Sequence, residues 1–269
     1  MKLSCQETLV PGSDLVEKAA FLQASGYEGI ELVGPGPGRF RDRAPELRKA
    51  AKAGVVMPTI CISQAPLIGH FEAVKRREAL AIMRELLSVC AEIGGRGVIT
   101  PASWGMFSRN FPPFTPPRAP GEDREVLLEG LNALAGFAAA EGVSVYLEPL
   151  NRYEDYLLNR VEQALEWCRE VGSDALMVIA DFYHMNIEEA DPPAALRLAG
   201  ARLGHVHMCD SNRYEPGAGH IDLAAHLEAL TAIGYEGYLA MEGRLSGPAE
   251  EVLPQIPHRI RQAGTAIAT

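Results

Sequence analysis

The sequence predicts a single α/β domain folded as a (β/α)8 TIM barrel that spans residues 1–269. Short β-branched runs alternate with longer segments of helical periodicity along the chain. This alternation is typical of parallel strands that are joined by right-handed crossovers. About 250 residues is the usual size of a barrel with eight strands and eight helices, and this chain has 269 residues.

The expected strands are short and apolar, and several carry β-branched or aromatic residues at period two. They cover residues 3–8, 29–33, 55–63, 97–100, 143–148, 175–180, 203–208 and 238–241. The expected helices run from Asp14 to Gly26, from Pro45 to Gly54, and over residues 72–93, 122–140, 159–171, 193–200, 223–233 and 248–263. Asn159 is the expected cap of the helix over 159–171, because its side chain can accept from exposed N–H groups.

Two glycine-containing segments are interpreted as turns. The tetrapeptide Gly-Tyr-Glu-Gly occurs at 26–29 and again at 234–237, each time between a helix and the next strand. Both copies should therefore lie at the N-terminal face of the barrel. The run Gly34-Pro-Gly-Pro-Gly38 resembles a phosphate-binding loop only superficially, because its prolines lack the N–H groups that would bind phosphate.

Residues 102–121 interrupt the alternation with Trp104 and three phenylalanines, Phe107, Phe111 and Phe114, among several prolines. A long connection inside a compact domain is usually functional or disordered. The aromatic content favours an ordered flap over a site, and a hydrophobic loop packed on the surface is the alternative.

Composition indicates a cytoplasmic protein that binds neither nucleic acid nor membrane. Lys and Arg number 25 against 35 Asp and Glu, so the formal charge is −10, which disfavours binding to a phosphate backbone. No stretch approaches the roughly 20 apolar residues of a membrane span, and an acidic residue interrupts the start where a signal peptide would be apolar. Five scattered cysteines without CxxC spacing are expected to be reduced and mostly buried.

The strongest functional signal comes from the ends of the last four expected strands. Each carries one polar side chain: Glu148, Asp181, His207 and Glu242. Glu148 directly precedes Pro149, which should end its strand. In a barrel, the C-terminal ends of the strands meet at one rim, where active sites are found. Three carboxylates and one imidazole would repel without a cation, so the sequence predicts a divalent metal site.

The predicted cofactor is one divalent ion per subunit. An oxygen-rich donor set with a single nitrogen suits a hard or borderline ion better than a thiolate-type zinc site does. Mn²⁺, Co²⁺ and Mg²⁺ all suit such a set, and Zn²⁺ stays possible. His205 faces the same way as His207, two positions deeper in the strand, and is expected to be a core histidine or an outer partner of the site. His70 and His226 do not lie near any of these strand ends, and they are expected to be ordinary histidines without a role in the site.

Two glutamates beside a metal suit proton transfer at a carbon next to a carbonyl. The metal would acidify the C–H bond and stabilise an enediolate while one glutamate removes the proton. The other glutamate could return a proton to the opposite face, which inverts the carbon. Return to the adjacent carbon would instead interconvert a ketose and an aldose.

Three motifs of the second half resemble the ketose 3-epimerases, the D-tagatose/D-psicose 3-epimerase group of the xylose isomerase-like TIM barrels. They are Leu-Glu-Pro-Leu-Asn-Arg-Tyr-Glu at 147–154, Asp-Phe-Tyr-His-Met-Asn-Ile-Glu-Glu at 181–189, and the segment 205–222 with His-Val-His, Asp-Ser-Asn-Arg and Pro-Gly-Ala-Gly-His-Ile-Asp. The resemblance implies inversion of C3 of a ketose or ketose derivative. It implies a Mn²⁺-like ion on Glu148, Asp181, His207 and Glu242.

The same resemblance implies that Glu148 and Glu242 are the catalytic acid/base pair. It implies that Glu154, His184 and Arg213 hold the oxygens of a sugar substrate, and that the protein is a homodimer or homotetramer. One departure is Arg244 in the run Glu242-Gly243-Arg244, where an aromatic residue is expected. A guanidinium at the rim would suit a phosphate or carboxylate on the substrate, so a free ketose, a sugar phosphate and a sugar acid all stay open.

Four alternatives remain at the level of sequence. Hydroxypyruvate isomerase and an aldose–ketose isomerase share the paired glutamates. An endonuclease IV-like DNA repair enzyme shares the barrel, but it would need more histidines at the strand ends and a basic groove. A sugar-binding barrel without catalysis would not need a base on each face of its ligand.

Overall fold

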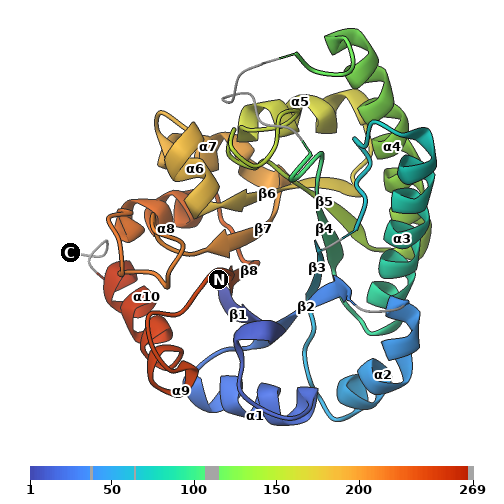
Figure 1. The fold of residues 1–269 in the computed structure, drawn as a ribbon. Coiled ribbons are helices and arrows are strands. Elements are labelled where there is room, and N and C mark those ends of the chain that lie inside the picture. The colour runs from blue at the N-terminus through green and yellow to red at the C-terminus, as the bar shows by residue number, and fades with distance from the viewer. Residues whose placement is uncertain (37–38, 64, 107–114, 266–269) are drawn as a thin grey trace.

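The structure, a computed structural model, describes residues 1–36, 39–63, 65–106 and 115–265. Eight parallel strands pair in chain order and close into one barrel because β1 also pairs with β8. The predicted (β/α)8 fold is confirmed (Figure 1). The strands are β1 (Lys2–Gln6), β2 (Gly29–Pro35), β3 (Thr59–Ser63), β4 (Gly97–Pro101), β5 (Ser144–Glu148), β6 (Leu176–Asp181), β7 (Leu203–Met208) and β8 (Tyr238–Met241).

The helices form an outer ring around the strands (Figure 1). They are α1 (Leu15–Ser25), α2 (Ala44–Lys52), α3 (Ala73–Glu92), α4 (Pro120–Glu141), α5 (Val161–Val171), α6 (Phe182–Glu188), α7 (Pro192–Ala199), α8 (Leu223–Ala232), α9 (Ala249–Val252) and α10 (Gln255–Thr265). Among the described residues, three short 3₁₀ turns also occur between these elements: Glu7–Leu9, Phe40–Arg43 and Gly200–Arg202. Within the described residues, no helix combines the length and the apolar character that a membrane crossing needs.

Several expected boundaries were wrong. The third strand begins at Thr59 instead of Val55, since Pro58 has no N–H for the sheet ladder. The expected final helix is two helices, α9 and α10, because Pro254 cannot continue the first one. Residues 182–188 form α6, a helix that is absent from the expected set.

The expected cap of α5 was also wrong. The helix begins after Arg160, and the amide of Asn159 instead donates to the carbonyls of Leu150 and Asp155 at 2.9 and 2.7 Å. Asn159 therefore fastens the loop that follows β5. Of the proposed flap over 102–121, Phe107, Phe111 and Phe114 lie outside the described residues.

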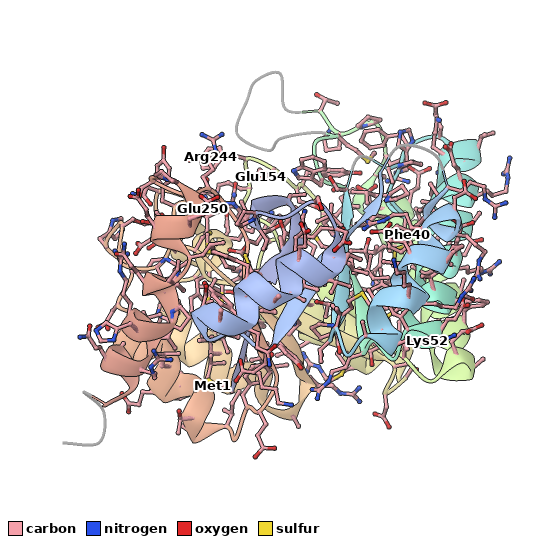
Figure 2. All side chains as sticks on the ribbon, turned by 90° about the horizontal axis from the view of Figure 1, so that it is seen from below. Met1, Phe40, Lys52, Glu154, Arg244 and Glu250 are labelled. Atoms are coloured by element: carbon pink, nitrogen blue, oxygen red, sulfur yellow. The ribbon has the colours of Figure 1, made fainter. Side chains whose placement is uncertain are left out.

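The repeated Gly-Tyr-Glu-Gly turn was predicted correctly. Tyr27 donates its backbone N–H to Leu22 at 2.9 Å, and Tyr235 donates to Leu230 in the same way at 3.0 Å. Met1 lies at this end of the barrel, whereas Glu154 and Arg244 lie at the opposite end (Figure 2). All five cysteines are free and buried, as expected.

The barrel interior has an apolar layer beneath a polar one. Tyr146, Cys61, Ile99 and Ile179 form a small buried cluster. Side chains two positions apart on a strand face the same side. Glu148 on β5 and Asp181 on β6 therefore share the interior face with Tyr146 and Ile179, one step nearer the C-terminal rim.

Candidate active site

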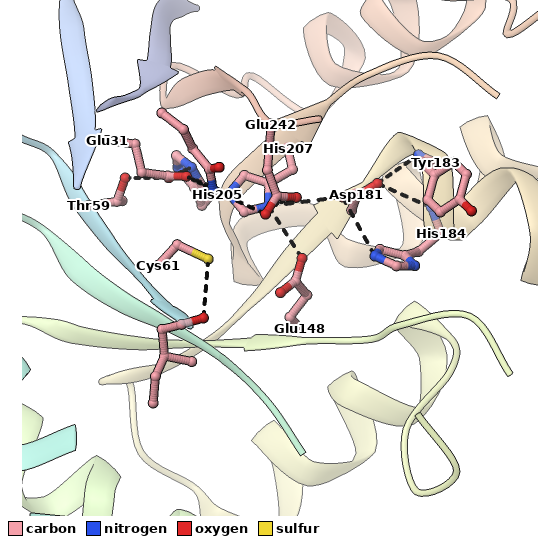
Figure 3. A network of polar contacts seen from close by, with 12 residues as sticks. Glu31, Thr59, Cys61, Glu148, Asp181, Tyr183, His184, His205, His207 and Glu242 are labelled. Atoms are coloured by element: carbon pink, nitrogen blue, oxygen red, sulfur yellow. Dashed lines mark hydrogen bonds and ion pairs between the residues drawn. The ribbon is translucent and has the colours of Figure 1, made fainter. Parts of the chain in front are cut away.

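The four polar side chains at the strand ends meet at one point inside the barrel mouth (Figure 3). Nδ1 of His207 lies 3.3 Å from Oε1 of Glu148, 3.2 Å from Oε2 of Glu242 and 4.0 Å from Oδ2 of Asp181. One donor atom from each of the four residues lies within 4.8 Å of all the others. The sequence thus correctly predicted which residues come together.

The spacing and chemistry of these donors fit a divalent cation. Ligands bonded to such an ion at about 2.0–2.2 Å are at most about 4.4 Å apart. The 4.8 Å span exceeds that limit only slightly, so small side-chain rotations suffice to close it. Three carboxylate oxygens and one imidazole nitrogen are a borderline-to-hard donor set, and the four residues can therefore hold a metal.

Asp181 is aimed at the cluster by the helix that follows it. Its Oδ1 accepts from the backbone N–H groups of Tyr183 and His184 at 2.7 and 3.1 Å, which caps α6. This helix end fixes one carboxylate oxygen. The other, Oδ2, is left to face the cluster and lies 2.9 Å from a guanidinium nitrogen of Arg213.

Glu242 immediately follows β8 and is held from two sides. Its Oε1 accepts from the amide of Gln6 at 3.0 Å, and its Oε2 accepts from Arg213 at 2.8 Å. Gln6 is the last residue of β1, the strand that pairs with β8 to close the barrel. Closure of the barrel therefore brings Gln6 and Glu242 together across 236 residues of sequence.

A buried carboxylate, Glu31, supports the cluster from below. It lies on β2 with no exposed surface. Its Oε1 is bonded to Nε2 of His207 at 2.9 Å and its Oε2 to Nε2 of His205 at 2.9 Å. Because Nε2 of His207 is engaged by Glu31, the other ring nitrogen is the one that faces the three carboxylates. His205 is thus an outer partner of the site, one of the two roles expected for it.

The ionisable groups of the cluster are strongly perturbed in opposite directions. Burial raises the pKa of Glu148, and the negative charge of Glu242 adds to this. Burial also opposes ionisation of Glu242, but the positive charges of His207 and Arg213 outweigh it and hold the pKa well below its usual value. For His207, burial is outweighed by the charges of Glu31 and Glu242, which raise its pKa well above the usual value. Two neighbouring carboxyls with separated pKa values are typical of acid/base pairs.

The loop after β5 presents Glu154 at the rim. The Glu154 carboxylate accepts from the side-chain amide of Asn151 at 2.9 Å and from the indole N–H of Trp104 at 3.2 Å. Asp155 fastens this loop to the one after β4 by accepting from the backbone N–H of Ser103 at 2.6 Å. The described part of the expected flap therefore holds a rim carboxylate in place.

His184 is oriented with one ring nitrogen toward the cluster. Its Nδ1 accepts from the backbone N–H of Asn151 at 3.1 Å. A backbone N–H can only donate, so Nδ1 carries no proton and the neutral ring is protonated at Nε2. Nε2 lies 3.9 Å from Asp181 and 3.4 Å from Arg213. His184 is therefore set to donate a hydrogen bond into the site.

Arg213 reaches the cluster from an unusual backbone conformation. Its φ is 65°, the one positive value among the non-glycine residues that the structure describes. The loop is packed against the residue after Glu242, since a Cβ on Gly243 would lie 2.6 Å from the carbonyl oxygen of Arg213. That carbonyl also accepts from the backbone N–H of Arg244 at 2.8 Å. The loops after β7 and β8 thus fix the guanidinium between Asp181 and Glu242.

Asp210 holds the loop that carries Arg213. Its carboxylate accepts from the backbone N–H groups of Ser211, Gly217 and Ile221 at 2.7, 2.7 and 3.0 Å. Burial opposes its ionisation, but these backbone donors outweigh burial and lower its pKa. A depressed pKa in the folded state means that ionised Asp210 stabilises the fold above its unfolded pKa of about 3.9.

This depressed pKa predicts an acid-dependent effect of Asp210→Asn. The variant is expected to unfold at a lower urea concentration than the wild type at pH 7. The difference should shrink as the pH falls below about 4, because the unfolded wild type then binds a proton on Asp210 that the folded protein binds only at lower pH. Urea unfolding from pH 7 to 3 measures it, with Asp174→Asn as control, since the Asp174 side chain is fully exposed. A gap that stays constant over this range would contradict the role of the charge.

A cavity of about 160 Å³ opens at this rim. The predicted substrate-contact residues Glu154, His184 and Arg213 line it together with Glu148 and Glu242, and its size suits one small ligand. Arg244 is exposed at the same end of the barrel (Figure 2), but it is not among the described residues that line this cavity.

Two supporting residues were missed by the sequence reasoning, Glu31 and Gln6. Glu31 gave a usable signal, because it is a charged residue in the otherwise apolar strand Gly-Ile-Glu-Leu-Val, and buried glutamates are almost always paired. Gln6 gave none, since a glutamine at a strand end is compatible with many roles.

Comparisons with known proteins agree with the fold. A family model described as xylose isomerase-like TIM barrel matches residues 19–263. A 3-dehydro-D-guloside 4-epimerase of Escherichia coli K12 is 37% identical over 246 residues, 91% of this chain and 93% of the relative. An L-ribulose 3-epimerase of Mesorhizobium japonicum is 37% identical over 249 residues, 90% of this chain and 79% of the relative. The crystal structure of the apo form of E. coli 3-keto-D-glucoside 4-epimerase superposes with a TM-score of 0.91 at 35% identity, covering 97% of this chain and 99% of that one.

Proposed function

The chain belongs to the xylose isomerase-like TIM barrel family and is an enzyme of the epimerase and isomerase class, and we propose that it inverts a hydroxyl-bearing carbon next to the ketone of a sugar. The observation that carries this proposal is the convergence of two glutamates, Glu148 and Glu242, on one donor cluster in a small cavity. Inversion next to a ketone needs one proton to leave one face of the carbon and another to arrive on the opposite face.

The proposed cofactor is one divalent ion, with Mn²⁺ preferred, on Glu148, Asp181, His207 and Glu242. The donor set and its 4.8 Å span support this assignment. When bound, the ion would polarise the substrate carbonyl and lower the energy of the enediolate that forms from it. Asp181 and His207 are ligands in this scheme, and α6 and Glu31 fix their orientations.

Glu148 and Glu242 are the proposed acid/base pair. One carboxylate removes the proton from the carbon next to the ketone, and the electron pair of the C–H bond enters the enediolate. The other glutamate, as a carboxylic acid, delivers a proton to the same carbon from the opposite face. The carbon is inverted and no net proton is consumed. Reaction in the opposite direction exchanges the two roles.

Glu154, His184 and Arg213 are the proposed substrate contacts. His184 directs an N–H into the cavity, Arg213 brings a guanidinium fixed between two carboxylates, and Glu154 offers acceptor oxygens at the rim. A sugar presents both donor hydroxyls and acceptor oxygens, so this mixture of one acceptor and two donors suits it.

Two substrate classes fit the same chemistry. C3 of a 2-ketose is adjacent to its carbonyl, and the L-ribulose 3-epimerase is named for that carbon. C4 of a 3-keto-glycoside is likewise adjacent to its carbonyl, and the E. coli 4-epimerases are named for that one. The C3 epimerisation of a ketose is the primary proposal, and the 0.91 TM-score to the 4-epimerase structure makes a 3-keto-glycoside the second candidate.

Deuterium incorporation tests the function directly. The Mn²⁺-loaded protein is incubated in D₂O with free 2-ketoses, their phosphates, 3-keto-glycosides and hydroxypyruvate, and products are followed by NMR. The expected result is one deuterium at the carbon next to the ketone, with inversion there. An aldose product would show an aldose–ketose isomerase instead, and the absence of exchange with every substrate would overturn the proposal.

A further inference from the structure

Glu31 forms the centre of a buried hydrogen-bond network directly beneath the donor cluster (Figure 3). Its Oε1 accepts from the amide of Gln6 at 3.1 Å and is bonded to His207 at 2.9 Å. Its Oε2 accepts from the hydroxyl of Thr59 at 2.7 Å and is bonded to His205 at 2.9 Å. A carboxylate has about four lone-pair sites, so Glu31 is fully satisfied without water.

This network determines which atom of His207 is offered to the cluster. Nε2 of His207 points down to Glu31, and Nδ1 points up to Glu148 and Glu242. The neighbouring ring of His205 stands nearly perpendicular, at 84° and 5.3 Å between centroids. His205 and His207 therefore clamp the two oxygens of Glu31 from one strand, β7, and the ring of His207 has little freedom to turn.

Glu31 is also linked to a second member of the cluster. Gln6 donates to Oε1 of Glu31 at 3.1 Å and to Oε1 of Glu242 at 3.0 Å from the same amide nitrogen. One outer carboxylate thus contacts His207 directly and reaches Glu242 through a single side chain.

We infer that Glu31 is a positioning residue that holds His207 with Nε2 protonated and Nδ1 free to bind the metal. This inference rests on the proposed metal site. Outer carboxylates that accept from a metal-bound histidine fix its tautomer and raise its basicity, and their loss typically weakens metal affinity about 10–100-fold. Glu31 itself neither lines the cavity nor belongs to the four-residue donor cluster, so it acts on the cluster through His207 and, by way of Gln6, through Glu242.

A second metal ion on Glu31, His205 and His207 is the competing interpretation, since their donor atoms also lie within 4.8 Å of one another. The contacts argue against it. Oε1 of Glu31 already contacts Gln6 and His207, and Oε2 contacts Thr59 and His205, so both oxygens have their hydrogen-bond partners without an ion. Metal stoichiometry distinguishes the two interpretations.

The test compares Mn²⁺ binding to the wild type, Glu31→Gln and Thr59→Val by isothermal titration calorimetry. Thr59→Val is the matched control because it removes one partner of Glu31 without touching His207. Glu31→Gln is expected to raise the Mn²⁺ dissociation constant about 10–100-fold and to change the visible spectrum of the Co²⁺-loaded protein. Thr59→Val should leave both close to the wild type.

The possible outcomes distinguish a failure of the role of Glu31 from a failure of the metal site. Equal affinities of the wild type and Glu31→Gln would overturn the role of Glu31 while leaving the metal site intact. A wild type that binds no ion would overturn the proposed site itself. Two ions per chain, with one lost in Glu31→Gln, would make Glu31 a ligand and contradict its positioning role.

A measurement on the wild type keeps the inference testable if Glu31→Gln does not fold. In histidine-¹⁵N-labelled protein loaded with diamagnetic Zn²⁺, a protonated, slowly exchanging Nε2 and an unprotonated Nδ1 are expected on His207. A proton on Nδ1 in the metal-loaded protein would overturn it.

Discussion

Replacing either glutamate of the pair, Glu148→Gln or Glu242→Gln, is expected to lower kcat for epimerisation about 10³-fold, within the range that general acid–base groups contribute. Each glutamate serves one face of the reacting carbon, so the loss of one stops inversion even when the other is intact. An amide can neither remove a proton nor return one at neutral pH. Steady-state kinetics with the accepted substrate measures the loss.

Isotope exchange gives these variants a more specific signature. Each epimer directs its C–H bond toward one of the two carboxylates. In a variant that keeps only one carboxylate, one epimer should still exchange its hydrogen for deuterium in D₂O, without inversion. The opposite epimer should exchange only in the other variant. Exchange of both epimers by a single variant would contradict the assignment of one glutamate to each face.

Two controls separate proton transfer from metal loss and from general damage. Glu250→Gln changes an exposed glutamate on α9 at the same end of the barrel (Figure 2), and it should retain wild-type turnover. Metal content is measured in both site variants, because a glutamine oxygen can still act as a ligand. A variant that keeps its metal and more than a tenth of its activity would contradict the acid/base role.

Asp181→Asn is expected to weaken Mn²⁺ binding by at least about 100-fold, since loss of a ligand costs more than the roughly 10–100-fold loss of an outer partner. The asparagine oxygen can still cap α6 by accepting from Tyr183 and His184, as Oδ1 of Asp181 does. The amide NH₂ then takes the position of Oδ2 and turns a donor toward the cluster. The helix is kept while the ligand is lost.

The chain offers a close control for this change. Asp222 caps α8 by accepting from the backbone N–H of Ala225 at 3.0 Å, so Asp222→Asn makes the same substitution at another helix cap. Mn²⁺ titration and metal-restored activity are measured for both variants. Equal Mn²⁺ affinities of Asp181→Asn and the wild type would remove Asp181 from the metal site.

Much of the fold and the upper part of the site were predictable from sequence because they depend on local rules. A polar residue at the C-terminal end of an apolar strand lies at the rim of a barrel, regardless of the other residues. This rule was enough to place Glu148, Asp181, His207 and Glu242 together. Helix ends were less predictable because competing partners decide them. Asn159 could have capped α5, but nearby loop carbonyls bind its amide instead.

The lower part of the site was not predictable because it depends on pairing between distant strands. Gln6 meets Glu242 only when β1 joins β8. Glu31 meets His205 and His207 only across the interior of the closed barrel. The placement of Arg213 depends on a left-handed residue and on contact with Gly243. Neither the left-handed conformation of Arg213 nor its contact with Gly243 follows from strand or helix periodicity.

Anomalous diffraction at the manganese edge, from crystals of the Mn²⁺-loaded protein, tests the proposed metal site most directly. One strong peak per chain is expected, within roughly 2.0–2.3 Å of donor atoms from Glu148, Asp181, His207 and Glu242. A peak elsewhere in the barrel, or none in crystals of protein that is active without divalent metal, would contradict it.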